Sequence, residues 1–314
     1  MEKSITPCRP FFLTLALLSV LGWSGCMNLP LSVESHFNRG VEKYDEGRYA
    51  DAIEEYKLAL RKNPDDFFAK YNLAVVYQDQ GKEEKAEQLY NEILSRTEDT
   101  NSRINLAAIY YFRGDHDQAF QELRTAAEKN RDSPDPLGAL GEYLEGQEQY
   151  EEAEKNYLAA LAIDDKDAFT LFRLGRLYCK MEKVGPCMEN LQKAVELNPQ
   201  EPAFLETLAN EHEMLGHPYE AINLLERVSV LQPDQAEIFT RLGDLYKSEQ
   251  LYQEAVQRYW SAAAIRDNNP HVHRSLAEIF ERLTQREQEE LKKMEDQNSL
   301  AQSPPSPAPH GGGR

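Results

Sequence analysis

The sequence predicts an all-α fold, a solenoid of about seven two-helix repeats that ends in a C-terminal capping helix. Three observations predict it. The 314-residue chain is 41% hydrophobic and 28% charged, which is enough apolar content for a sizeable folded body. A pattern of small and aromatic residues recurs at a nearly constant interval, which is typical of repeats that bury their apolar faces against one another. Glycines and prolines also stand where the helices of such repeats should end.

The interval is measured from one small residue in the second helix of each repeat. Successive markers are 34 residues apart, with one spacing of 33, at Ala52, Ala86, Ala119, Ala153, Cys187, Ala221 and Ala255. This spacing predicts seven repeats within residues 34–270, at 34–66, 67–99, 100–132, 133–167, 168–201, 202–235 and 236–270.

Each repeat is predicted to be a helical hairpin. In the second repeat, Leu73 and Tyr77 are four residues apart on one helical face, and Gly81 supplies the left-handed residue that ends the helix. Prolines stop three of the second helices, at Pro64, Pro199 and Pro233. The turn glycine is absent from the fourth, fifth and seventh repeats, which have Glu148, Glu182 and Gln250 in its place.

Two motifs identify the kind of repeat. "LGRLY" (Leu174 to Tyr178) and "LAVVY" (Leu73 to Tyr77) form the first helix, and "YQEAVQRYWSAA" (Tyr252 to Ala263) forms the second. These motifs resemble the tetratricopeptide repeat, over about residues 34–283. The resemblance implies a right-handed superhelix whose first helices line a concave surface that binds proteins or peptides.

The C-terminal end continues the pattern for one more helix. Residues 271–296 place Leu276 and Phe280 in register and then become strongly polar, which predicts a capping helix on an open solenoid end. Residues 297–314 are rich in Pro, Ser and Gly and are predicted to be a disordered tail.

The N-terminal end has the layout of an export signal. Basic residues precede a run of 13 mainly apolar residues, Phe11 to Trp23, and a helix needs about 20 to cross a bilayer. The small residues before Cys26 resemble a bacterial lipobox, although Trp23 stands where such motifs usually have an aliphatic residue. We therefore expect residues 1–25 to be a lipoprotein signal peptide, Cys26 to be lipidated, and residues 26–33 to form a linker.

In the sorting rule of enteric bacteria, which this resemblance brings in, an aspartate after the lipidated cysteine retains a lipoprotein in the inner membrane. Met27 stands at that position, so the resemblance implies the periplasmic face of the outer membrane. Two alternatives stay open at this point. One is an uncleaved N-terminal anchor in the inner membrane, and the other is ordinary cleavage that leaves Cys26 as a free thiol.

The resemblance places a candidate peptide-binding groove on the first helices of the first three repeats. An asparagine recurs at one position in all three and offers donors and an acceptor to the backbone of an extended peptide, while apolar neighbours supply most of the affinity. The alternatives are that these residues are ordinary for the repeat, or that residues 27–34 of the chain fill the groove. The candidate residues are Phe37, Asn38, Val41, Tyr44, Phe68, Tyr71, Asn72, Val75, Ile104, Asn105, Ala108, Tyr111 and Phe112.

The later repeats present mixed charges at the corresponding positions. Arg173, Arg176, Arg241 and Lys247 are candidates for a second, charge-specific site. Alternating charges more often form a solvated face with surface ion pairs, which is the other interpretation.

Residues for catalysis are not evident. There is no glycine-rich phosphate loop and no nucleophile motif, so we expect neither an enzyme nor a cofactor. His271 and His273 are two residues apart, which places them on different helix faces, and we expect no metal site. Cys179 and Cys187 either form a disulfide, as an oxidising compartment allows, or pack as separate thiols.

The predicted function is that of a membrane-tethered periplasmic adaptor for a protein or peptide. The formal net charge of −19 disfavours nucleic acid as a partner, and no small-molecule substrate is evident. The architecture resembles outer-membrane repeat lipoproteins that assist assembly of an envelope complex such as a pilus or secretion pore. The alternative is a self-associating scaffold that uses its convex surface, with Trp260 as a test position.

Overall fold

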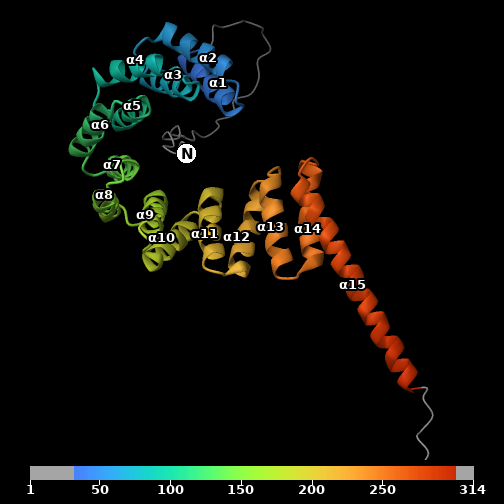
Figure 1. Ribbon diagram of the computed structural model, residues 1–314. Coiled ribbons are helices and arrows are strands. Elements are labelled where there is room, and N and C mark those ends of the chain that lie inside the picture. Colours follow the sequence, from blue (N-terminus) through green and yellow to red (C-terminus); the bar gives the residue numbers. More distant parts are fainter. Residues whose placement is uncertain (1–31, 302–314) are drawn as a thin grey trace, which may run out of the picture. The chain divides into compact units, whose positions relative to one another are not determined.

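The structure is a computed structural model that describes residues 32–301, which form fifteen helices and no strand (Figure 1). The first helices of the repeats are α1 (Val33–Asp45), α3 (Phe67–Asp79), α5 (Thr100–Arg113), α7 (Asp135–Gly146), α9 (Ala168–Lys180), α11 (Pro202–Met214) and α13 (Ala236–Ser248). The second helices are α2 (Tyr49–Lys62), α4 (Glu83–Leu94), α6 (His116–Lys129), α8 (Tyr150–Ile163), α10 (Val184–Leu197), α12 (Pro218–Leu231) and α14 (Tyr252–Ile265). The last helix is α15 (Pro270–Ala301).

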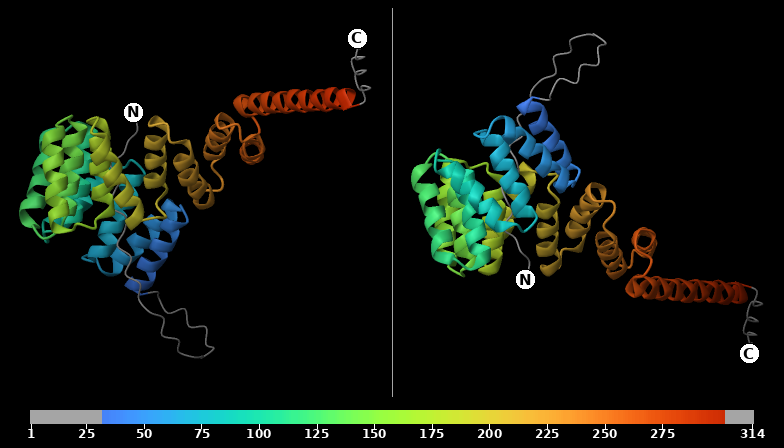
Figure 2. Two further views of the ribbon diagram at one scale, coloured as in Figure 1. Left: turned by 90° about the horizontal axis from the view of Figure 1, so that it is seen from below. Right: turned by 90° about the horizontal axis from the view of Figure 1, so that it is seen from above.

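The described residues divide into two compact parts, residues 32–190 and residues 191–301. Within each part, successive helices pack as antiparallel hairpins, which Figure 2 shows from two sides. Consecutive first helices also touch in the amino-terminal part, where α1 contacts α3, α5 contacts α7 and α7 contacts α9. The all-α repeat array predicted from the sequence is therefore confirmed for residues 32–301.

The core lies between the two helices of each hairpin and continues between neighbouring hairpins, as one buried cluster runs from α2 to α5. All seven marker residues are at most 1% exposed, as small residues at close helix contacts should be. Four large tyrosines, Tyr56, Tyr90, Tyr157 and Tyr259, are also almost fully buried. Three of them face a glycine of the first helix, since a Cβ added at Gly40, Gly141 or Gly243 would lie 2.5–2.7 Å from a tyrosine ring carbon.

Helices begin and end for local reasons. The side chains of Ser32, Asp66 and Asp99 accept hydrogen bonds from the first-turn N–H groups of α1, α3 and α5. The helices α2, α10 and α12 each end two residues before Pro64, Pro199 and Pro233, as predicted.

The hairpin turns keep a left-handed residue even where glycine is absent. Gly81 and Gly216 have φ of 67° and 74°, and Glu148, Glu182 and Gln250 adopt almost the same conformation with φ of 59°, 58° and 61°. The packing of the two helices therefore imposes the left-handed conformation at the turn. At Glu148, Glu182 and Gln250 this conformation costs conformational free energy, because these residues have a Cβ.

Glycine at one of these turns is expected to stabilise the protein. Gln250→Gly should raise the free energy of unfolding by up to about 1 kcal/mol, because a left-handed non-glycine residue costs roughly 1–2 kcal/mol and glycine loses some of this gain through unfolded-state entropy. The matched control is Gly216→Ala, where a Cβ meets open space and only the conformation is penalised. Urea unfolding should move the two variants in opposite directions, and a destabilised Gln250→Gly variant would contradict this account.

The last helix differs from the prediction at its end. Val272, Leu276 and Ile279 of α15 are buried against α14, as a cap requires. However, α15 begins at Pro270 and continues to Ala301, so residues 297–301, which we expected in the disordered tail, are helical. No proline or glycine occurs between Pro270 and Pro304, so nothing in the sequence ends the helix earlier.

Candidate protein-binding surface

The predicted groove residues lie on α1, α3 and α5, but their exposure varies widely. Six of them are at most 9% exposed, so these side chains pack inside the protein and offer little surface to a ligand. These six are Tyr71, Asn72, Val75, Ile104, Asn105 and Ala108.

The row of three accessible asparagines is not present. Asn105 is 1% exposed, and its Nδ2 donates to the hydroxyls of Tyr71 and Tyr90, both at 3.1 Å. Nδ2 of Asn72 donates to the carbonyl oxygen of Phe68 at 2.9 Å. The prediction that Asn72 and Asn105 pair with a peptide is therefore wrong, because the amide of Asn105 binds tyrosines of α3 and α4 and the amide of Asn72 binds the backbone of its own helix. Of the three asparagines, Asn38 is the exposed one.

An aromatic patch remains accessible at the amino-terminal ends of α1 and α3. We define it by Phe37, Val41 and Phe68. The side chain of Phe68 is 56% exposed, and its ring centroid lies 6.3 Å from that of Phe37. Phe37 and Val41 are half-buried. Exposed apolar surface of this kind commonly marks a site of interaction with another protein.

The opposite ends of the same two helices are acidic. Asp45 and Asp79 are the last residues of α1 and α3, and both are exposed. The hydroxyl of Tyr44 donates to Oδ2 of Asp79 at 2.6 Å. Burial and this carboxylate raise the pKa of Tyr44, so its hydroxyl stays protonated and joins the first repeat to the second.

The predicted residues of α5 form a separate feature. The ring centroid of Tyr111 lies 5.6 Å from that of Phe112 and 5.7 Å from that of Tyr143. The Tyr111 hydroxyl lies against Gly146, since a Cβ added at Gly146 would be 2.5 Å from the hydroxyl oxygen. Tyr111 thus packs against α7, while Phe112 is 44% exposed. The pattern of the sequence did not reveal this contact, because the position of Gly146 against Tyr111 depends on how α5 meets α7.

The predicted charged site consists mainly of internal ion pairs. In the amino-terminal part, Nε of Arg173 lies 3.4 Å from Glu142, so the pair joins α9 to α7. The guanidinium of Arg176 lies over the ring of Phe172, 5.6 Å from its centroid. In the carboxy-terminal part, Arg241 pairs with Glu213 and Lys247 with Glu278. These contacts favour the interpretation of a face with ion pairs over that of a binding site.

A polar network is buried beside these pairs. Glu145 is 8% exposed, accepts a hydrogen bond from the hydroxyl of Tyr157 at 3.0 Å, and forms an ion pair with Lys180. Burial raises the pKa of Glu142, and Arg173 opposes this shift. The network joins α7 to α8 and α9 and belongs to the packing of the repeats.

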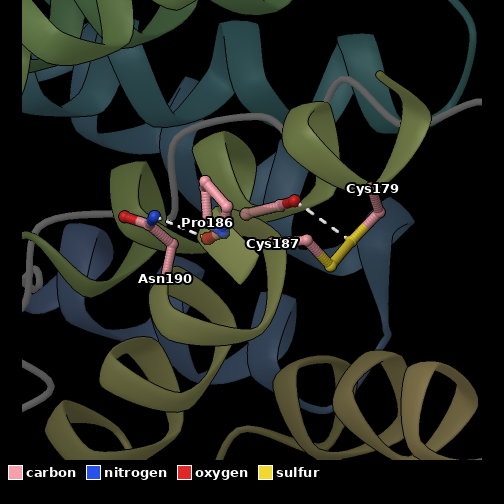
Figure 3. The surroundings of a disulfide bond; sticks show 5 residues. Cys179, Pro186, Cys187 and Asn190 are labelled. Carbon is pink, nitrogen blue, oxygen red and sulfur yellow. Dashed lines mark hydrogen bonds between the residues drawn. A yellow bond between two sulfur atoms is a disulfide. The ribbon is translucent and has the colours of Figure 1, made fainter. Parts of the chain in front are cut away.

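Cys179 and Cys187 form a disulfide that joins α9 to α10 (Figure 3). Their Cα atoms are 5.0 Å apart, and Cys187 is 1% exposed. Nearby, Nδ2 of Asn190 donates to the carbonyl oxygen of Pro186 at 2.8 Å in α10. Of the two sequence interpretations, the structure supports the disulfide.

The predicted lipidation site, Cys26, and the signal peptide lie outside the described residues. Among residues 32–301, no helix combines the length and the apolar character that a membrane span needs.

Comparisons with known proteins identify the repeat. Models of the family described as tetratricopeptide repeat match residues 43–109, 101–125, 135–167 and 170–201. These matched residues carry tetratricopeptide repeats. The tetratricopeptide repeat is a protein-interaction fold, and residues 32–301 share its helical hairpin architecture.

Solved tetratricopeptide repeat structures share the fold at low sequence identity. A tetratricopeptide repeat protein from Parabacteroides merdae is 19% identical with a TM-score of 0.50, over 79% of this chain and 98% of that one. The structure of the Cut9-Hcn1 hetero-tetramer of APC/C matches at 17% identity with a TM-score of 0.56, over 80% of this chain and 49% of that one. These similarities show the fold alone.

One curated tetratricopeptide repeat protein is also similar in sequence. The small glutamine-rich tetratricopeptide repeat-containing protein 2 of Mycosarcoma maydis is 30% identical over 100 residues. The match covers 32% of this chain and 28% of that protein, so it concerns the repeats rather than the whole protein.

Proposed function

We propose that this chain is a membrane-tethered periplasmic adaptor that binds a protein or an extended peptide on α1 and α3. In this role it assists assembly of an envelope complex such as a pilus or secretion pore. The observation that carries the binding role is the aromatic patch, since Phe68 is 56% exposed on a fold built for protein interactions.

Two observations support the location. Cys26 follows a short apolar run in the sequence, in the manner of a lipidated cysteine. The Cys179–Cys187 disulfide suits an oxidising compartment such as the periplasm, because such bonds are rare in reducing cytosol.

The short linker supports a role close to the membrane. The helix α1 begins at Val33, seven residues after Cys26, and seven extended residues span at most roughly 25 Å. A lipidated Cys26 would therefore hold the aromatic patch near the bilayer, where a partner that inserts into the membrane would pass.

A second candidate function is favoured by a different surface. Trp260 of α14 is 55% exposed on the outer, second-helix side of the seventh repeat. In this alternative the chain self-associates through its second helices and binds no peptide on α1 and α3.

Pull-down of the tethered full chain from membranes distinguishes the two functions. Phe68→Ser is expected to abolish partner capture with little change in thermal unfolding, because the Phe68 side chain is mostly solvated. Tyr219→Ser is the matched control, since Tyr219 is also exposed, at 59%, but lies on α12. Asparagine substitutions are unsuitable here because Asn105 is buried.

The opposite outcome identifies the alternative. If Phe68→Ser captures the partner normally and Trp260→Glu loses it, the second-helix surface is the binding surface. Recovery of the Cys26→Ser variant in the membrane fraction at the level of the wild type would contradict the lipid tether.

A further inference from the structure

We propose that the surface of α1 and α3 selects a basic partner segment, one in which an apolar side chain lies about three to five residues from a lysine or arginine. The proposal rests on the proposed function and specifies its partner. The apolar side chain would contact the aromatic patch, and the cation would lie between Asp45 and Asp79.

The two helices present these features in the same order. On α1, Phe37, Val41 and Asp45 are spaced four residues apart and form one stripe along the helix. The two helices run side by side in the same direction, because Phe37 contacts Phe68 near one end and Tyr44 contacts Asp79 near the other. The surface is therefore apolar at its amino-terminal end and acidic at its carboxy-terminal end.

The spacing follows from helix geometry. Phe37 and Asp45 are 8 residues apart, or about 12 Å along α1 at 1.5 Å per residue. Phe68 and Asp79 are 11 residues apart, or about 16 Å along α3. An extended segment covers such a distance in roughly four or five residues, and the long side chain of lysine or arginine shortens this by about one.

The acidic end has no lysine or arginine partner among residues 32–301. Among the side chains that the structure describes, no lysine or arginine pairs with Asp45 or Asp79, and the nearby Lys43 pairs with Glu46 at 2.9 Å. A helix carries partial negative charge at its carboxy-terminal end, so an aspartate as last residue is unfavourably placed. By contrast, α5 and α9 end in the cations Arg113 and Lys180. A cation from a partner would relieve this repulsion in both repeats.

The surface between the two ends is shallow. Tyr71, Asn72 and Val75 are at most 9% exposed and leave no deep cleft for a backbone. Side chains at the two ends therefore carry the recognition. The net charge of −19 adds long-range attraction for a basic segment.

The linker of the chain itself does not fit this chemistry. Residues 27–33 contain no lysine or arginine, and Glu34 follows them. This argues for a separate partner as the occupant.

Synthetic peptides test the proposal on the full chain. The probe is a labelled ten-residue Ser/Gly peptide with one leucine and, four residues later, one arginine, and its comparison peptide has glutamate in place of the arginine. Fluorescence anisotropy is expected to show at least tenfold tighter binding of the arginine peptide, with the difference shrinking as salt is added.

Variants assign the effect to the two carboxylates. Asp45→Asn together with Asp79→Asn is expected to weaken binding of the arginine peptide about tenfold with little change in stability. An amide oxygen at position 79 can still accept the hydrogen bond from Tyr44, and a neutral side chain suits the end of a helix better. Asp132→Asn together with Asp234→Asn is the control, since it removes the same charge from exposed residues elsewhere and should leave binding unchanged.

Failure of this inference is distinguishable from failure of the proposed function. Equal binding of the two peptides, including no binding of either, overturns the selection of a basic segment. The same holds if the Asp45 and Asp79 variant binds like the wild type. The proposed function is decided separately, by whether Phe68→Ser loses the native partner.

Discussion

Gly141→Ala is expected to lower the free energy of unfolding by about 1–3 kcal/mol, which is the usual cost of overpacking a core. A Cβ at this position would lie 2.7 Å from Cδ1 and Cε1 of Tyr157, which is fully buried. The ring cannot move away freely, because its hydroxyl donates to Glu145 at 3.0 Å and Glu145 is itself buried. The better helix propensity of alanine, up to roughly 1 kcal/mol, offsets part of this loss.

Urea unfolding and amide hydrogen exchange measure the effect of Gly141→Ala. Exchange is needed because an array of repeats can open locally, and protection should fall first in α7 and α8. Gly185→Ala is the matched control, since a Cβ at Gly185 of α10 meets no atom other than those of its chain neighbours and displaces no buried ring. Wild-type stability of Gly141→Ala would mean that the Tyr157 ring can be displaced at no cost.

Cys187→Ala is expected to lower the stability of the fifth repeat by about 2–3 kcal/mol, the chain-entropy contribution of a short disulfide loop. The bonded cysteines are 8 residues apart and join α9 to α10. Alanine is the residue that the other six repeats have at this position, where it is fully buried. Packing should therefore tolerate the substitution, and the loss of stability measures the contribution of the disulfide.

Hydrogen exchange in α9 and α10 measures this second effect. Wild-type protein treated with a thiol reductant should lose protection to the level of Cys187→Ala, and the same treatment should leave the variant unchanged. If oxidised wild type and Cys187→Ala are equally protected, the disulfide contributes nothing to the stability of this hairpin.

The repeat architecture could be predicted because its signals are local. The marker residues recur every 33 or 34 residues, and each is buried. The prolines after α2, α10 and α12 are also local signals, because each helix ends two residues before its proline. Even the turns without glycine keep their geometry, since Glu148 and Gln250 adopt the left-handed conformation.

The details of the surface could not be predicted in this way. A position on a helical face does not determine how closely the next helix approaches, and Asn105 is buried by tyrosines 15 and 34 residues away in the sequence. Asp45 and Asp79 were missed for another reason, because single aspartates at helix ends look like ordinary solvated charges. Asp45 and Asp79 are 34 residues apart and so occupy equivalent positions in successive repeats, which is the signal that could have revealed them.

The amide of Asn105 has a mechanical consequence for the repeats nearest the N-terminus. It joins α5 to Tyr71 of α3 and to Tyr90 of α4, so two hydrogen bonds cross the junction between the second and third repeats in the dry interior. Bonds shielded from water resist sliding more than apolar contacts alone, which adapt as side chains shift. The second and third repeats therefore respond to an applied force as one stiff block.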